Sequence, residues 1–116
     1  MAGAYDDRDG KIWMNGKLVD WRDANVHILT HAMHYASSVF EGERCYSGKI
    51  FKSREHSERL IRSGKLIDFD IPYTVDEIET AKQAALEANG LTGVLEGDDG
   101  VFRIGRVSEI APSDVD

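Results

Sequence analysis

Apolar and polar residues alternate in the first half of the chain, which is the pattern of half-buried strands. Two short alternating runs in IWMNGKLVDW flank Asn15-Gly16. This pair accepts positive φ at both central positions of a two-residue turn, so the segment predicts a tight hairpin. A second hairpin is predicted over 39–51, with Ser47-Gly48 at its turn.

The hydrophobic period then changes to that of a helix. SREHSERLIRSGKLI places Leu60, Ser63, Gly64 and Ile67 on one stripe, and the small residues in it indicate close packing on the sheet. The pattern of strands first and helices afterwards predicts an α+β fold, with a mostly antiparallel sheet and two helices packed on one face.

A second helix carries its own start and stop signals. Thr74 and Glu77 have the spacing of a capping box, and Tyr73 is placed to pack against Ile78. Asn89-Gly90 provides the matching C-terminal stop.

Composition and charge narrow the function classes. The chain has 116 residues, of which 41% are hydrophobic and 30% charged, as expected of one globular domain. Its net charge of -7 argues against a nucleic-acid partner, since phosphate-backbone binding needs clustered cations. A single cysteine, Cys45, is expected to be a small buried hydrophobe and fits a reducing cytoplasm. No apolar run suggests a signal peptide or a membrane span.

The run YASSVFEGERCY combines charge with a strand pattern. Alternation gives it two faces, one with Phe40, Gly42, Arg44 and Tyr46 and the other with Val39, Glu41, Glu43 and Cys45. The first face has aromatic walls, a gap at Gly42 and a cation, which is the outline of a pocket wall. The alternative is that Phe40 and Tyr46 are core, Gly42 marks a bulge and Arg44 pairs with a surface glutamate.

Three histidines raise a separate hypothesis. An extended stretch over 26–28 is predicted to lead into a short turn or helix after Thr30. If the stretch were helical instead, His27, His31 and His34 could share one face and bind zinc or nickel. We expect no metal site, because the extended pattern at His27 is that of a strand.

The order and wording of several motifs resemble a known family. HYASSVFEGERCY, EHSERL and the W-N-G-x-L-V opening are similar to the amino-terminal small domain of the branched-chain amino-acid aminotransferases, which are class IV pyridoxal-phosphate enzymes. The resemblance runs from about residue 10 to residue 92. The resemblance implies 11–92 as an aminotransferase-like small domain and leaves 93–116 as a divergent tail with one strand. Residues 1–10 are small and acidic without periodicity and are expected to be a flexible arm.

Residue roles follow from the resemblance by position. Tyr35, Phe40, Gly42 and Arg44 match positions that line the substrate side-chain pocket, and Arg59 matches the arginine that holds the cofactor phosphate. The family transfers an amino group between branched-chain amino acids and 2-oxoglutarate. Its small domain covers pyridoxal phosphate bound to a larger domain, and two subunits contribute to each site, which implies a homodimer.

The family's Schiff-base lysine has no match in this sequence. None of the six lysines lies in a matching motif, and all are expected to be solvated surface residues: Lys11, Lys17, Lys49, Lys52, Lys65 and Lys82. The chain alone is therefore expected to be inactive, without catalytic residues, and to bind pyridoxal phosphate weakly or not at all. The alternative function is a dimerising or partner-binding module, which could associate with a full-length aminotransferase.

Two further departures concern local sequence. GVLEGDDG replaces the strand that the family has after the position of Thr92. Residues 99–116 are similar to a segment near the carboxy-terminal end of the full-length enzymes, which would make them a remnant of the large domain. Ala36 stands where the family usually has glycine, so its methyl group could restrict the backbone.

Overall fold

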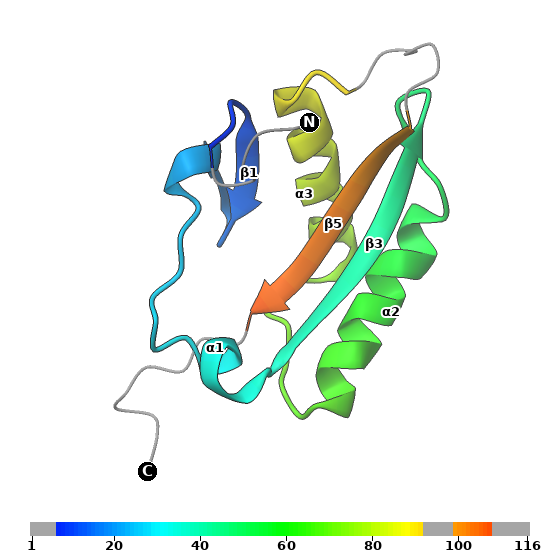
Figure 1. The fold of residues 1–116 in the computed structure, drawn as a ribbon. Coiled ribbons are helices and arrows are strands. Elements are labelled where there is room, and N and C mark those ends of the chain that lie inside the picture. The colour runs from blue at the N-terminus through cyan, green and yellow to red at the C-terminus, as the bar shows by residue number, and fades with distance from the viewer. Residues whose placement is uncertain (1–6, 92–98, 108–116) are drawn as a thin grey trace.

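A computed structural model describes residues 7–91 and 99–107 of the chain. Two helices lie against one side of a sheet, and a small hairpin packs beside the second helix (Figure 1). This arrangement confirms the predicted α+β class. The elements are β1 (Lys11–Met14), β2 (Lys17–Asp20), a 3-10 turn (Trp21–Asp23), α1 (His31–Tyr35), β3 (Ser38–Tyr46), β4 (Lys49–Ile50), α2 (Ser53–Leu66), α3 (Val75–Ala88) and β5 (Asp99–Val107).

The first hairpin is confirmed. Strands β1 and β2 pair antiparallel, and both Asn15 and Gly16 have positive φ, at 52° and 93°. The Asn89 side chain fixes this hairpin to the end of α3, because its amide accepts a hydrogen bond from the Lys11 N–H and donates one to the Lys11 carbonyl, both at 2.9 Å. The amide thus replaces a strand partner for β1.

The main sheet has the order β4-β3-β5 and is antiparallel throughout. Ser47 and Gly48 form the predicted turn between β3 and β4, with φ of 50° and 78°. Strand β5 pairs with β3 along its whole length, from Ser38 opposite Val107 to Tyr46 opposite Asp99. The segment GVLEGDDG extends over 93–100, so its residues 93–98 lie outside the described part of the chain.

The two helices begin and end largely where their signals lie. Helix α3 has the full capping box, in which Thr74 Oγ1 accepts from the Glu77 N–H and the Glu77 carboxylate accepts from the Thr74 N–H. In α2, Leu60 and Gly64 are buried as the stripe predicts, whereas Ile67 lies just past the helix and is 44% exposed. A Cβ at Gly64 would approach Ile71 to 3.2 Å, so only a small residue fits there.

A buried ion pair crosses the core between the sheet and the helices. Lys82 Nζ on α3 lies 2.5 Å from Glu43 Oε1 on β3, and both residues are at most 3% exposed. The prediction that every lysine is a solvated surface residue is therefore wrong for Lys82. The other five lysines, all in the described part, are exposed.

Helix α1 confirms the turn or helix expected after Thr30 and ends at Ala36 in the left-handed region, with φ of 57°. A residue with a Cβ is strained in this conformation, whereas glycine adopts it freely. The glycine usual at this position in the resembled family therefore has a local backbone reason.

None of the described helices could traverse a bilayer. The longest, α2 and α3, have 14 residues each and carry charged side chains on their outer faces.

We expect Lys82→Met to lower the free energy of unfolding by about 3–5 kcal/mol, because Glu43 would remain buried without its cation. The double variant Glu43→Leu/Lys82→Met should recover at least half of that loss, since it removes both charges. Urea denaturation measures both, with Lys49→Met at an exposed lysine as the control. A single variant as stable as the unmodified protein would contradict a stabilising role for the pair.

The strain at Ala36 predicts that replacing alanine by glycine has opposite effects on the free energy of unfolding at two positions. Ala36→Gly should raise the free energy of unfolding by about 0.5–1 kcal/mol, because it relieves the left-handed strain. Ala32→Gly, inside α1, should lower it by a similar amount. Thermal and urea unfolding of the two variants compare them directly, and equal shifts in the same direction would refute the explanation.

Candidate functional site

The two faces of β3 have different environments. Glu41, Glu43 and Cys45 are each no more than 4% exposed beneath the helices, whereas Phe40 is 74% exposed and Tyr46 42% exposed. The alternative in which Phe40 and Tyr46 belong to the core is therefore wrong. The predicted burial of Cys45 is confirmed.

The face of β3 with Phe40, Gly42, Arg44 and Tyr46, here called the open face, carries three of the four residues assigned by resemblance to the substrate pocket. A Cβ built on Gly42 would meet no described atom within 4 Å, and the pairing of β3 with β5 runs through this position without a bulge. Arg44 is exposed as well, and Tyr35, the last residue of α1, is 70% exposed and stacks on His31 with ring centroids 4.5 Å apart. The four predicted residues thus all remain accessible to a ligand.

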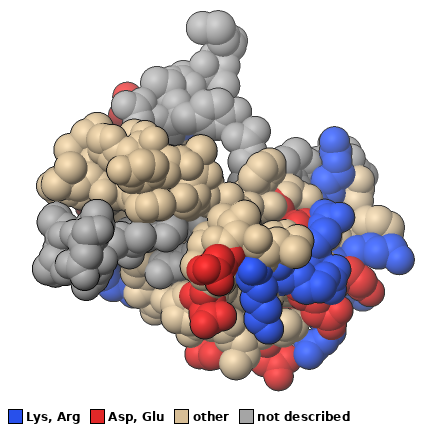
Figure 2. All heavy atoms as spheres, turned by 90° about the horizontal axis from the view of Figure 1, so that it is seen from below, with Lys and Arg blue, Asp and Glu red and all other residues tan. Residues whose placement is uncertain are grey.

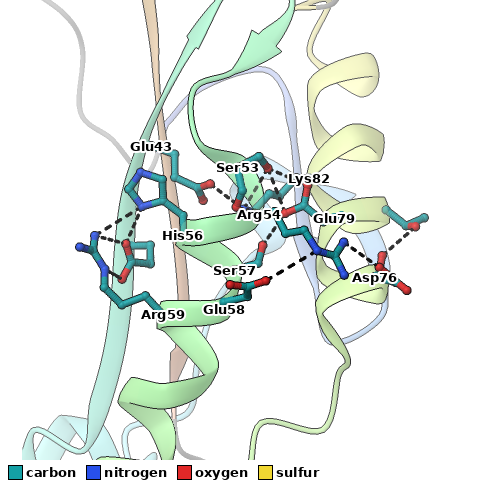
Figure 3. Close-up of polar contacts among 12 residues, drawn as sticks. Glu43, Ser53, Arg54, His56, Ser57, Glu58, Arg59, Asp76, Glu79 and Lys82 are labelled. Atoms are coloured by element: carbon teal, nitrogen blue, oxygen red, sulfur yellow. Dashed lines mark hydrogen bonds and ion pairs between the residues drawn. The ribbon is translucent and has the colours of Figure 1, made fainter.

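Arg59 lies on α2 at the edge of the same strand, and its guanidinium is held by a carboxylate. Its Nε donates to Glu41 Oε2 at 2.7 Å and its Nη2 donates to Glu41 Oε1 at 2.5 Å. His56, one turn earlier on α2, contributes a third contact, with Nδ1 2.6 Å from Glu41 Oε1 (Figure 3). Sequence reasoning identified Arg59 but neither of these two partners.

Pairing among Arg59, Glu41 and His56 shifts the pKa values of the first two groups. The hydrogen bonds from Arg59 lower the pKa of the Glu41 carboxyl below its ordinary value against the opposing effect of burial, and His56 adds to the lowering. The same pairing raises the pKa of Arg59. Glu41 is therefore ionised in the folded protein at neutral pH and remains paired with the guanidinium.

A second polar cluster lies deeper between the helices and β3 (Figure 3). Besides Glu43, Lys82 Nζ contacts the Ser53 carbonyl at 2.9 Å and Glu79 Oε1 at 3.3 Å. Glu79 also accepts from the hydroxyl groups of Ser53 and Ser57. The sequence does contain one signal for this cluster, because Ile78, Lys82 and Leu86 follow at intervals of four on the buried side of α3.

The carboxylates of this cluster respond to burial in different ways. Burial raises the pKa of Glu43 although Lys82 opposes the change, and Glu43 Oε2 has no hydrogen-bond partner among the described residues. For Glu79 burial also acts to raise the pKa, but the hydroxyl groups of Ser57 and Ser53 together with Lys82 lower it overall. All donors of Lys82 are used within the protein, so this cluster serves structure.

Whether Arg59 can bind a cofactor phosphate depends on which of its N–H groups are not already used. A guanidinium has five N–H groups, and Glu41 takes one from Nε and one from Nη2. Among the described residues both groups on Nη1 have no partner and the second on Nη2 approaches only His56 Nδ1, at 3.4 Å, on a side chain that is 58% exposed. These donors fit one edge of a phosphate group, while the rest of a phosphate site would have to come from elsewhere.

The histidines do not assemble a metal site in the described part of the chain. His27 Nδ1 accepts from the Leu29 N–H at 2.9 Å, while His34 Nε2 lies 2.7 Å from the Ile28 carbonyl. Their ring nitrogens thus have local backbone partners, and His31 stacks on Tyr35.

Comparison with known proteins finds relatives over part of the chain. No protein family model matches the chain. It is 49% identical over 80 residues to a probable branched-chain-amino-acid aminotransferase of Rickettsia felis, covering 69% of this chain and 28% of that protein. It is 47% identical over 89 residues to the branched-chain-amino-acid aminotransferase of Pseudomonas aeruginosa, covering 73% and 29%.

Solved structures show the same fold. The branched-chain aminotransferase of Thermoproteus uzoniensis with norvaline superposes with a TM-score of 0.80 at 34% identity, over 94% of this chain and 36% of that one. A second branched-chain amino acid aminotransferase, solved with pyridoxamine 5'-phosphate, gives 0.68 at 28% identity, over 90% and 42%. The chain spans about 28% of the length of the curated relatives it matches. It is homologous to the branched-chain amino-acid aminotransferases over about 70% of its own length.

Proposed function

We propose that residues 11–92 form the small-domain half of a pyridoxal-phosphate aminotransferase site for branched-chain amino acids and 2-oxoglutarate. The observation that carries this proposal is the open face of β3, where Phe40 and Gly42 remain uncovered while the opposite face is sealed by helices. An aromatic side chain next to a gap suits the aliphatic side chain of a branched-chain substrate. Homology to the aminotransferases supports the assignment.

Pyridoxal phosphate would supply an electron sink for bonds at the substrate α-carbon. In this chain Arg59 would bind one edge of its phosphate through the N–H groups that Glu41 leaves free. Tyr35, Phe40, Gly42 and Arg44 would enclose the substrate side chain and exclude water once the face is covered. The remaining phosphate contacts and the second half of the site would come from a larger domain.

We further propose that the 116-residue chain does not transaminate by itself. Lys82, the buried lysine, is engaged with Glu43 on the helix side of the sheet and so cannot serve the open face. The other lysines are exposed and match no family motif. The proposed setting is the cytoplasm, since the single cysteine, Cys45, is a buried free thiol.

The cofactor contact can be tested by titrating the chain with pyridoxal phosphate and following tryptophan quenching. We expect weak binding, and Arg59→Gln should weaken it about tenfold or more because a charge-assisted contact is lost. Arg54→Gln, on the same helix, is the matched control and should leave the affinity unchanged. Measurable transamination of a branched-chain amino acid, or equal affinity in the Arg59 variant, would overturn the corresponding part of the proposal.

A second candidate function is association, and a specific observation favours it. Large apolar side chains that remain exposed extend from the loop before α1 to β3, namely Val26, Ile28, Leu29, Met33, Tyr35 and Phe40. On the face drawn in Figure 2 the described charged groups gather on one side, and most of the remaining described surface is uncharged. Such a surface favours a homodimer or a complex with a full-length aminotransferase.

We expect sedimentation equilibrium to show a mass that rises with concentration in the micromolar range. Phe40→Glu should shift the chain toward monomer, because it places a charge in the apolar surface. Lys17→Glu, in the exposed hairpin, is the control and should leave the mass distribution unchanged. A monomer at every concentration that also fails to bind a full-length aminotransferase would exclude the association function.

A further inference from the structure

The Glu41 carboxylate is buried and fully engaged in hydrogen bonds. It lies on the central strand β3, is 4% exposed, and uses both of its oxygens as acceptors for Arg59. Arg59, in contrast, lies on the outer side of α2 with a side chain that is 58% exposed. A free arginine in such a position samples many rotamers, so the carboxylate selects one of them.

His56 holds the carboxylate from the other side. Its Nδ1 donates to Glu41 Oε1 at 2.6 Å, and its side chain is 21% exposed. Because Nδ1 carries the donated hydrogen, the approach of Arg59 Nη2 to Nδ1 at 3.4 Å is a packing contact. His56 and Arg59 occupy successive turns of α2 and meet on the same carboxylate (Figure 3).

We propose that Glu41 and His56 are positioning residues, which hold the Arg59 guanidinium with its Nη1 edge presented to the cofactor phosphate. This inference rests on the proposed function of Arg59 as a phosphate contact. The inference gives a function to the buried carboxylate of Glu41. This residue cannot belong to the proposed substrate pocket, since it lies on the opposite face of β3 from Phe40 and Gly42.

Charge and orientation act in opposite directions here. An ionised Glu41 repels a phosphate, so its removal by charge alone would favour binding. The Arg59 side chain is more than half exposed, however, and exposed charges are strongly screened by water and salt. Preorganisation of the guanidinium is not screened. We therefore expect orientation to prevail, most visibly in 1 M salt, where the Debye length is about 3 Å.

The test compares pyridoxal phosphate affinities of the full chain in 0.1 M and 1 M salt. Glu41→Gln should raise the Kd three- to tenfold in 1 M salt, because a carboxamide has one acceptor oxygen and cannot form the two parallel bonds in which Nε and Nη2 each donate to a separate oxygen. Asp76→Asn is the matched control. It also removes one negative charge, but from the carboxylate that pairs with Arg54, which lies on α2 as Arg59 does. Its Kd should stay within twofold of that of the unmodified chain.

His56 provides a rescue experiment that does not change the carboxylate. His56→Gln keeps a donor for Glu41 and should bind pyridoxal phosphate nearly as well as the unmodified chain, whereas His56→Leu should bind three- to tenfold more weakly. If Glu41→Gln does not fold by circular dichroism, this pair decides. Equal affinity of His56→Leu and His56→Gln would then overturn the positioning role.

A ligand-free measurement separates the two proposals. The Nε–H resonance of Arg59 should exchange slowly with water in the unmodified chain and rapidly in Glu41→Gln or His56→Leu. Rapid exchange in the unmodified chain would overturn positioning. If Arg59→Gln does not weaken pyridoxal phosphate binding, both the phosphate contact and the positioning role are overturned. If Arg59→Gln weakens binding while a folded Glu41→Gln binds as tightly as the unmodified chain or more tightly, only the positioning role is overturned.

Discussion

The ion pair between Glu43 and Lys82 is the constraint on which this small fold depends. It joins the central strand β3 to α3 through a layer in which polar groups are buried beside Cys45, Leu60 and Leu86. A pair of this kind contributes little net free energy relative to an apolar replacement, but the loss of one partner is costly. The contact therefore ties the register of β3 to the rotation of α3, because a shift of either element would leave a charge buried alone.

This constraint also defines the opposite face of β3. Since the strand alternates, burial of Glu41, Glu43 and Cys45 leaves Phe40 and Gly42 on the side away from the helices. The same backbone geometry that seals the core thus leaves the Phe40 ring exposed and the space at Gly42 open. The acidic residues of this strand, Glu41 and Glu43, lie on its helix-facing side, whereas Arg44 is the cation of the exposed side.

Arg59 lies where the buried layer meets solvent. It pairs with Glu41 at the border of the core, while its side chain remains 58% exposed. Under the proposed function the same side chain would also bind a phosphate, which is feasible because the guanidinium is planar and its donors point in different directions. A lysine in this position could satisfy Glu41 or a phosphate but could not present two edges.

The sequence by itself determined the local structure. Turn pairs at Asn15-Gly16 and Ser47-Gly48, and the capping box at Thr74, act over a few residues and were predictable for that reason. The grouping of Phe40 and Gly42 on one side of a strand could also be predicted, because successive side chains of a strand alternate between its faces. Only the tertiary structure decided which side would be covered, since that choice depends on two helices that follow later in the chain. It paired Lys82 with Glu43 and Arg59 with Glu41, partners that are 39 and 18 residues apart. The spacing of Lys82 between Ile78 and Leu86 indicates its inward side, but no local pattern identifies either partner.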